Sequence, residues 1–264
     1  MPTAPPAPPA RCVLTDPAGR EVLSYVPSTT GAQPWVTEPR IPPGVQLDEV
    51  VPTVLRELPG WIVDGDDELV TALISAGARR RRHASVMRYD LVTAPVPAGW
   101  AAPPLPAGLS FAPVDPDPER LFATWIRAYP PGHPDAPNGN TRADFEADLA
   151  PLLSGKVLGP LLPVSGCVLD RAAPDRAVAA CLVNDWPDEG PWISEVFRDP
   201  EPRYAGIGAA LLRRTLWLAS AAGLRSIGLG VTVGNPAQRV YATVGFRVTS
   251  TSLTCIIPAR EGSE

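Results

Sequence analysis

Residues 192–209 read WISEVFRDPEPRYAGIGA and carry the strongest local signal in this chain of 264 residues. The first seven residues predict a strand, because they are mainly apolar and rich in β-favouring side chains. Pro200 and Pro202 end that strand, since proline cannot donate to a strand ladder. A turn containing Gly206 and Gly208 then opens a helix whose apolar positions recur at helical spacing. A strand, a glycine-rich turn and a helix N-terminus therefore follow one another directly.

This turn is suited to a phosphate group. Free backbone N–H groups and the positive end of the helix dipole converge there, and glycine lets the backbone approach a ligand closely. A Walker A loop would need Gly-Lys-Ser/Thr after the glycines, and the sequence has none. A dinucleotide loop would need a third glycine where Leu211 stands. The turn therefore predicts a pyrophosphate site of another kind.

A second segment, residues 235–246, reads NPAQRVYATVGF. Asn235 is a good helix N-cap, Pro236 suits the first helical position, and Gly245 is typical of a left-handed C-terminal stop. Arg-x-x-Gly-x-Gly after a strand, followed by an Asn–Tyr helix that closes with Gly-Phe, resembles the two acyl-CoA motifs of the GNAT acetyltransferase superfamily. The resemblance covers residues 109–257.

The resemblance implies an α+β fold, the GNAT acyl-CoA N-acyltransferase fold, with a central mixed, mostly antiparallel twisted sheet flanked by helices. We expect a smaller N-terminal α+β domain beside it. Residues 94–108, APVPAGWAAPPLPAG, have the composition of a linker. The expected organisation is a flexible Pro/Ala tail at 1–10, an N-terminal domain at 11–93, this linker, and a catalytic domain at 109–264.

The resemblance also implies roles for particular residues. The strand before the loop splays from its neighbour in this family, and its backbone pairs with the pantetheine arm of acetyl-CoA. The residues expected to do so here are Val196, Phe197 and Arg198. The pyrophosphate is expected on Tyr204, Ala205, Gly206, Ile207, Gly208 and Ala209, with Arg203 at the edge. Asn235 would contact the pantetheine, and Tyr241 would protonate the departing CoA thiolate, since tyrosine is protonated at neutral pH.

The general base is expected on the same strand. Glu195 lies close to where an acceptor amine should approach, and strand alternation places it with Phe197, opposite Ser194 and Val196. A bulge would change that assignment. A water chain that ends at Glu195, Asp185 or Glu189 is an alternative. Tyr241 also has a structural interpretation, as a packed aromatic side chain on an amphipathic helix.

The N-terminal half can be aligned with the C-terminal half. Asp67 to Arg79 aligns with Asn235 to Arg247, so that Gly77 falls on Gly245 and Leu73 falls on Tyr241. We therefore interpret this half as a degenerate partial GNAT module that binds no CoA, because it has no Arg-x-x-Gly-x-Gly. An unrelated α+β cap is the alternative.

The predicted function is acetyl-CoA-dependent N-acetyl transfer to a small-molecule or protein amine, by direct transfer in a ternary complex. The alternative is a non-catalytic acyl-CoA-binding or regulatory protein with the same fold. Acidic residues at Asp185, Asp188 and Glu189 favour a cationic acceptor, or simply form a solvated hairpin. His133, in a Pro-rich loop, is interpreted as a surface histidine.

Composition excludes several other classes of function. A net charge of −5 argues against nucleic-acid binding, including transfer from aminoacyl-tRNA, and the arginines at 79–82 are expected on an exposed strand face. The four cysteines, Cys12, Cys167, Cys181 and Cys255, have no metal-ligand spacing, so no metal is expected. Scattered thiols and the absence of a long apolar run predict a cytoplasmic protein without membrane attachment, either monomer or homodimer.

Overall fold

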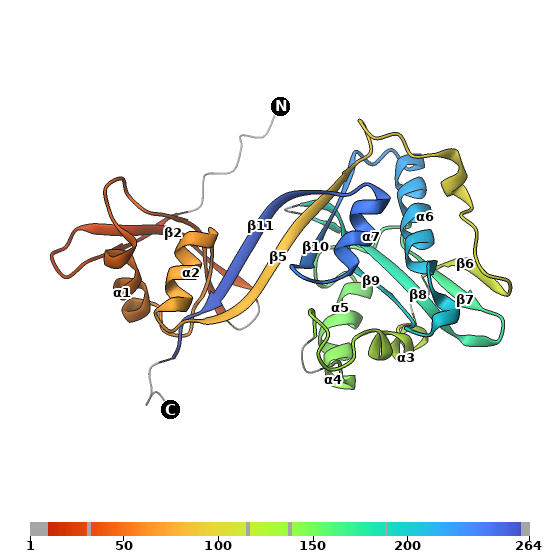
Figure 1. The fold of residues 1–264 in the computed structure, drawn as a ribbon, viewed down its shortest axis with the longest axis horizontal. Helices are drawn as coiled ribbons and strands as arrows, with labels where there is room; N and C mark the ends of the chain where they lie inside the picture. The colour runs from red at the N-terminus through yellow and green to blue at the C-terminus, as the bar shows by residue number, and fades with distance from the viewer. Residues whose placement is uncertain (1–9, 31–32, 115–116, 137–138, 188, 260–264) are drawn as a thin grey trace. The chain divides into compact units, whose positions relative to one another are not determined.

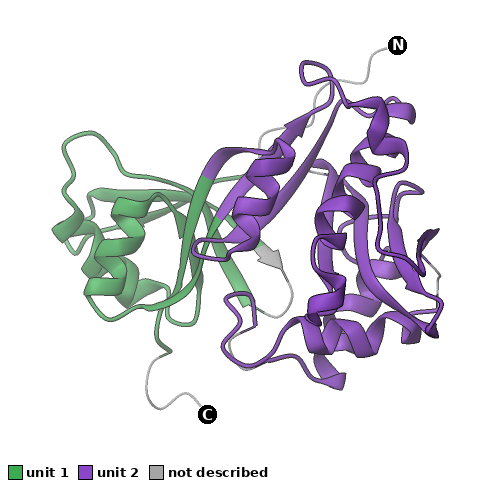
Figure 2. Ribbon diagram, turned by 45° about the vertical axis from the view of Figure 1, so that its right-hand side comes forward, with its two compact units in different colours: residues 1–84, 251–264 green, residues 85–250 purple. Residues whose placement is uncertain are grey.

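The computed structural model describes residues 10–30, 33–114, 117–136, 139–187 and 189–259. The chain forms two compact units, shown in different colours in Figure 2. Unit 1 comprises Met1–Ala84 and Thr251–Glu264, and unit 2 comprises Ser85–Ser250. The divisions fall inside two long strands, β5 (Arg79–Asp90) and β11 (Arg247–Ile256). The expected N-terminal tail lies outside the described residues, apart from Ala10.

Unit 1 has the strand order β1-β2-β3-β4-β11-β5. Its other elements are β1 (Cys12–Thr15), β2 (Glu21–Thr30), β3 (Gln33–Arg40), α1 (Leu47–Glu57), β4 (Ile62–Gly65) and α2 (Asp67–Ser75). Strand β2 pairs antiparallel with both β1 and β3, and β3 runs parallel to β4. Buried residues of α1 and α2, such as Val54 and Leu73, pack with Val36 and Val63 of the strands into one core.

Unit 2 has the strand order β11-β5-β10-β9-β8-β7-β6. Its strands are β6 (Leu109–Pro113), β7 (Gly166–Asp170), β8 (Ala173–Trp186), β9 (Gly190–Arg198) and β10 (Ser226–Thr232). Its helices are α3 (Glu119–Ala128), α4 (Arg142–Asp144), α5 (Ala150–Leu153), α6 (Ile207–Ala221) and α7 (Ala237–Val244), with 3-10 turns at Ala98–Ala101 and Pro202–Tyr204 and a π turn at Phe145–Leu149. Strands β6 to β9 pair antiparallel in succession, and β9 pairs parallel with β10. The sheet is therefore mixed and mainly antiparallel, as expected.

Helices cover both faces of the unit 2 sheet (Figure 1). Residues of α6 and α7, including Leu211 and Tyr241, form one core with the strands. Residues of α3 and of the π turn, including Trp125 and Phe145, form a second core on the other face. A site built on β9 therefore has a different layer of side chains on each side.

Residues 94–108 do not form a linker between the units. Ala94, Val96, Trp100 and Leu105 pack against the core of unit 2. Arg214 of α6 also donates a hydrogen bond to the carbonyl oxygen of Ala101. The prolines end regular structure here, but the apolar side chains between them are still partly buried. The units divide instead between positions 84 and 85, and the C-terminal strand returns to unit 1, unlike the expected boundaries at 93 and 109.

Candidate active site

Strands β9 and β10 separate from one another, as the sequence motif implies. They run in parallel and pair at Gly228 with Trp192 and at Leu229 with Ile193. Beyond Ile193, β9 continues to Arg198 in register with β8 alone. The backbone of residues 196–198 therefore has one edge that β10 does not pair.

A β-bulge lies at the point of separation. Leu182 pairs with Glu195 but the next residue, Val183, pairs with Ile193, so Ser194 is the extra residue of β9. The Ser194 hydroxyl donates a 2.6 Å hydrogen bond to Asn184, whose amide in turn donates to carbonyls next to α5. Ser194 therefore lies on the same face as Glu195, and the expected alternation of these two residues is wrong because the bulge interrupts it.

Glu195 accepts a hydrogen bond from the hydroxyl of Tyr129, at the end of α3. Removal from water raises the pKa of the Glu195 carboxyl to about 7, and the negative charges of Asp135 and Asp148 act in the same direction. The Tyr129 hydroxyl and the Trp125 indole oppose that rise in pKa. A carboxyl group with a pKa near 7 can accept a proton at neutral pH and release it again.

Tyr241 is buried in the core beneath α7, with 8% of its surface exposed. Burial raises the pKa of its phenol, and the neighbouring Cys181, Glu195 and Asp135 add to the rise. Tyr241 therefore stays protonated and can donate a proton. Burial also raises the pKa of the Cys181 thiol to about 12, so Cys181 is no thiolate nucleophile at neutral pH.

Asn235 connects the start of α7 to the loop after α3. Its side-chain oxygen accepts a 2.8 Å hydrogen bond from the backbone N–H of Ala237, so it caps the helix as expected. Its amide donates to the Asp135 carboxylate at 2.5 Å. At the other end of α7, Gly245 has a φ of 120°, which favours glycine and ends the helix.

The turn before α6 presents free backbone donors. Gly206 has a left-handed conformation (φ 84°), no side chain caps the helix, and its first turn contains no acidic residue. A Cβ on Gly208 would meet only the side chain of Arg198, at 3.9 Å. Among the described residues, no carbonyl or side chain accepts from the N–H groups of residues 206–209. These four N–H groups can therefore take an anion.

Tyr204 and Ala205 differ from the other predicted loop contacts. Their N–H groups donate to Glu201 and Pro202 within the 3-10 turn, so these donors are already used. The Tyr204 hydroxyl donates a 2.7 Å hydrogen bond to the buried carboxylate of Asp170. The Tyr204 side chain thus fastens the loop to β7, and the unused backbone donors are those of residues 206–209.

A set of ion pairs holds the same loop in place. Asp199, which is fully buried, accepts hydrogen bonds from Arg127 at 2.9 Å and from Arg176 at 2.6 Å. Arg203 pairs with Glu201 at 2.8 Å and remains half exposed at the edge of the loop. Arg203 lies where the sequence motif implies, with its guanidinium shared with protein carboxylates.

The acidic residues that were considered as alternatives to Glu195 lie away from it. Glu189 pairs with Arg88, and Asp185 lies three residues beyond Leu182, the partner of Glu195 on β8. Asp188 lies outside the described residues. Tyr129 and Asp135 were not predicted as site residues, although their loop was recognised. His133 of the same loop packs its ring against Tyr129, with ring centroids 4.8 Å apart.

The chain has the GNAT fold, as comparison with solved structures shows. A GCN5-related N-acetyltransferase from Sphaerobacter thermophilus matches with a TM-score of 0.64 and 19% identity, over 94% of this chain and 81% of that one. A tandem GNAT protein from the clavulanic acid biosynthesis pathway matches with a TM-score of 0.52 and 14% identity, over 95% and 84%. A GNAT-family acetyltransferase from Colwellia psychrerythraea gives 0.52 and 14%, over 92% and 83%. The sequence matches no protein-family model and no curated protein.

Three further observations concern the described residues. Within them, no cluster of three or more His, Cys, Asp or Glu side chains could hold a metal ion. All four cysteines lie within the described residues, and none of them forms a disulfide. No helix in the described part of the chain is both long enough and apolar enough to cross a membrane.

Proposed function

We propose that this protein is an N-acetyltransferase that moves the acyl group of acetyl-CoA to an amine, directly and in a ternary complex. The observation that carries the proposal is the Glu195 carboxyl, which has a pKa of about 7 and lies at the bulge where β9 leaves β10. The same unit also has a strand edge that β10 does not pair, a helix N-terminus with free donors and a protonated tyrosine. This combination suits acyl transfer from a thioester.

Each part has a defined role in the proposed reaction. The unpaired backbone of residues 196–198 would bind the pantetheine arm, and the N–H groups of residues 206–209 would bind the pyrophosphate. Glu195 would take a proton from the acceptor ammonium, and the free amine would attack the thioester carbonyl. Collapse of the tetrahedral intermediate breaks the C–S bond, and Tyr241 would protonate the CoA thiolate. The nitrogen would lose its second proton in the same step, and that proton would restore the Tyr241 phenol. The products are an amide and free CoA.

The acceptor is proposed only as a small-molecule or protein amine, and the location as the cytoplasm. Unit 1 is proposed to be a degenerate repeat of the CoA-binding elements that binds no CoA itself. The alternative function is a non-catalytic acyl-CoA-binding protein. That alternative has no need for a carboxyl group held by Tyr129 at the bulge of β9, and this geometry favours the enzyme.

The test is release of free CoA from acetyl-CoA in the presence of a panel of amines, with wild-type protein and the Glu195→Gln variant. We expect release with at least one class of amine, and strongly reduced release in the variant. Isothermal calorimetry with acetyl-CoA should show similar affinity for both proteins. Tight acetyl-CoA binding without release for any amine would favour the non-catalytic alternative.

A further inference from the structure

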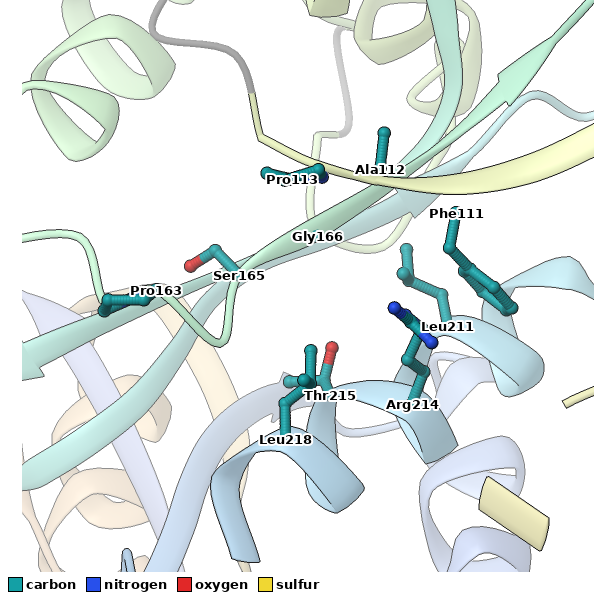
Figure 3. Close-up of a pocket in the computed structure, with 10 residues that line it drawn as sticks. All are labelled: Phe111, Ala112, Pro113, Pro163, Ser165, Gly166, Leu211, Arg214, Thr215 and Leu218. Carbon is teal, nitrogen blue, oxygen red and sulfur yellow. The ribbon is translucent and has the colours of Figure 1, made fainter. Parts of the chain in front are cut away.

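Unit 2 contains a cavity of about 190 Å³ that the proposed reaction does not use (Figure 3). It lies between α6 and the edge formed by β6 and β7. Phe111, Pro113, Leu211 and Leu218 form much of its apolar lining, and Arg214 and Thr215 contribute polar groups. None of these residues belongs to the acyl-CoA contacts described above.

Thr215 places a hydroxyl without a hydrogen-bond partner in this lining. Thr215 is 1% exposed, and within the described part of the chain its hydroxyl oxygen has no hydrogen-bond partner. A threonine inside a helix can bond to the carbonyl four residues earlier, but Thr215 makes no such bond. The Cys181 thiol is close enough for the Thr215 hydroxyl to lower its pKa. A thiol, however, is only a weak hydrogen-bond partner. An unmade hydrogen bond in a buried place is costly, and a ligand oxygen would complete it.

Arg214 brings a positive charge to the same cavity. Its guanidinium stacks on Phe111, 5.0 Å from the ring centroid, and one N–H donates to the carbonyl oxygen of Ala101. Among the described carboxylates, none forms an ion pair with Arg214. The guanidinium is therefore held in a fixed position while its charge remains unbalanced. The close-up shows Arg214 and Thr215 as neighbours on α6, both extending toward the strands (Figure 3).

We propose that this cavity is a binding site for a small carboxylate with a short apolar body. The carboxylate would accept hydrogen bonds from Arg214 and Thr215, since charge-assisted bonds to arginine are strong and directional. The apolar body would lie against Phe111, Leu211 and Leu218. The volume is below the roughly 300–1,000 Å³ of pockets for drug-sized ligands, so the ligand is small. A cationic amine is excluded because Arg214 would repel it.

The probes for the test are benzoate and isovalerate, with benzamide and benzylamine as an uncharged and a cationic control. Calorimetry of the full chain, without acetyl-CoA, should show binding of a carboxylate with a Kd below about 1 mM. Neither control compound should bind. Arg214→Gln should weaken carboxylate binding about tenfold or more, because it removes a charge-assisted hydrogen bond. Thr215→Val, which keeps the shape of the side chain, should weaken it several-fold.

Arg213→Gln is the matched control, since it removes the same charge from the neighbouring position of α6, which does not line the cavity. Absence of binding by both carboxylates would overturn the proposal, as would equal binding of benzamide or an equal loss in the Arg213 variant. Acetyl-CoA affinity, measured on the same variants, should not change. The carboxylate site and the acyl-transfer proposal can therefore fail separately.

Discussion

Units 1 and 2 run through the same succession of elements and differ in what each presents to a ligand. Unit 1 proceeds through β1, β2, β3, α1, β4, α2 and β5, and unit 2 through β7, β8, β9, α6, β10, α7 and β11. In each, the first three strands are antiparallel and the third runs parallel to the fourth. In each, that parallel pair is registered at two positions, starting from Trp35 in unit 1 and Trp192 in unit 2. We interpret unit 1 as a repeat of the CoA-binding elements, more extensive than the sequence indicated.

The two helix starts differ in charge, because only that of α1 is acidic. Helix α1 has Asp48 and Glu49 in its first turn, and Glu49 accepts a hydrogen bond from the N–H of Gln46 at 3.0 Å. Helix α6 has Gly208 where α1 has Asp48, as the second residue of each helix. The topology that creates a helix N-terminus is therefore shared, but only unit 2 leaves it free and uncharged for a pyrophosphate.

The carboxylates beside the two strand separations also differ. Glu38 stands three residues after Trp35, as Glu195 stands three residues after Trp192. Glu38 is exposed and pairs with Arg11 and Arg40. Glu195 lies beneath Tyr129 and has a raised pKa. The same position on the strand thus holds a surface ion pair in one unit and a candidate base in the other.

The largest expected effect comes from Glu195→Gln, which should slow acetyl transfer roughly 10²- to 10⁴-fold, as expected for loss of a general base. Glu38→Gln, at the matching position of unit 1, should leave the rate unchanged. Single-turnover transfer at saturating acetyl-CoA measures both. Equal rates in wild type and Glu195→Gln would remove Glu195 from the mechanism, and a loss in Glu38→Gln would break the contrast between the units.

The pH dependence sharpens the same assignment. With a Glu195 pKa of about 7, the rate should rise with pH through about 7 and then level off, because the ionised form is the base. Tyr129→Phe removes a hydrogen bond that lowers this pKa, so the midpoint should move to higher pH. A midpoint that stays in place or moves down would show that another group titrates.

Ionisation of Glu195, which the proposed catalysis requires, should also lower the stability of the fold. Its folded-state pKa is raised above the ordinary value of 4.5, so its protonated form stabilises the fold below that pH, and this stabilisation is lost as pH rises toward 7. Glu195→Gln should therefore melt higher than wild type at pH 8, by a few degrees, with little difference at pH 4. Melting curves at the two pH values provide the measurement.

The Gly208→Asp variant gives α6 an aspartate at its second position, where α1 has Asp48. The new carboxylate would face the pyrophosphate at short range, so acetyl-CoA affinity should fall by about 100-fold or more. The fold should not suffer, because a Cβ at Gly208 makes only an ordinary van der Waals contact with Arg198 and an acidic residue suits a first helical turn. Calorimetry measures the affinity and circular dichroism the fold. The reverse change in unit 1, Asp48→Gly, should leave the affinity unaltered, and unchanged affinity in Gly208→Asp would refute the loop assignment.

Tyr241→Phe should reduce the rate of the chemical step about 100-fold, at the lower end for loss of a general acid, because a CoA thiolate leaves fairly well unprotonated. The ring remains, so packing and acetyl-CoA affinity should change little. Leu73, the residue aligned with Tyr241, is a fully buried apolar side chain in α2. A wild-type rate in Tyr241→Phe would show that Tyr241 has only a structural role, like that of Leu73.

The sequence predicted the elements whose signals are local. The two motif helices, their glycine and asparagine ends, and the strand before Pro200 all lie where the residues indicate. Strands β1 to β3 were not predicted, because residues 12–40 mix polar and β-branched side chains without clear alternation. The polar middle of β11 carries no strand signal in the sequence, and pairing with neighbouring strands keeps it extended.

The sequence could not locate the parts of the site that depend on distant contacts. Tyr129 reaches Glu195 across 66 residues, and Asp135 reaches Asn235 across 100. The bulge at Ser194 depends on register with β8, and no residue of β9 encodes it alone. The pKa of Glu195 follows from these contacts, so sequence patterns could suggest the residue but could not show its protonation behaviour.

The smallest expected effect concerns the caps of the two matching helices. Asp66 accepts a 2.8 Å hydrogen bond from the N–H of Leu69 and caps α2, and Asn235 caps α7 through Ala237. Asp66→Ala and Asn235→Ala should each cost about 1 kcal/mol of stability, the usual value for a lost cap. Hydrogen exchange of α2 and α7, respectively, should report that loss. Only Asn235→Ala should also lower the acetyl-transfer rate, because it releases Asp135, and with it the loop that follows Tyr129, from the start of α7. A similar rate loss in Asp66→Ala would mean that the rate falls only because the fold is less stable. Asn235 would then have no role beyond capping its helix.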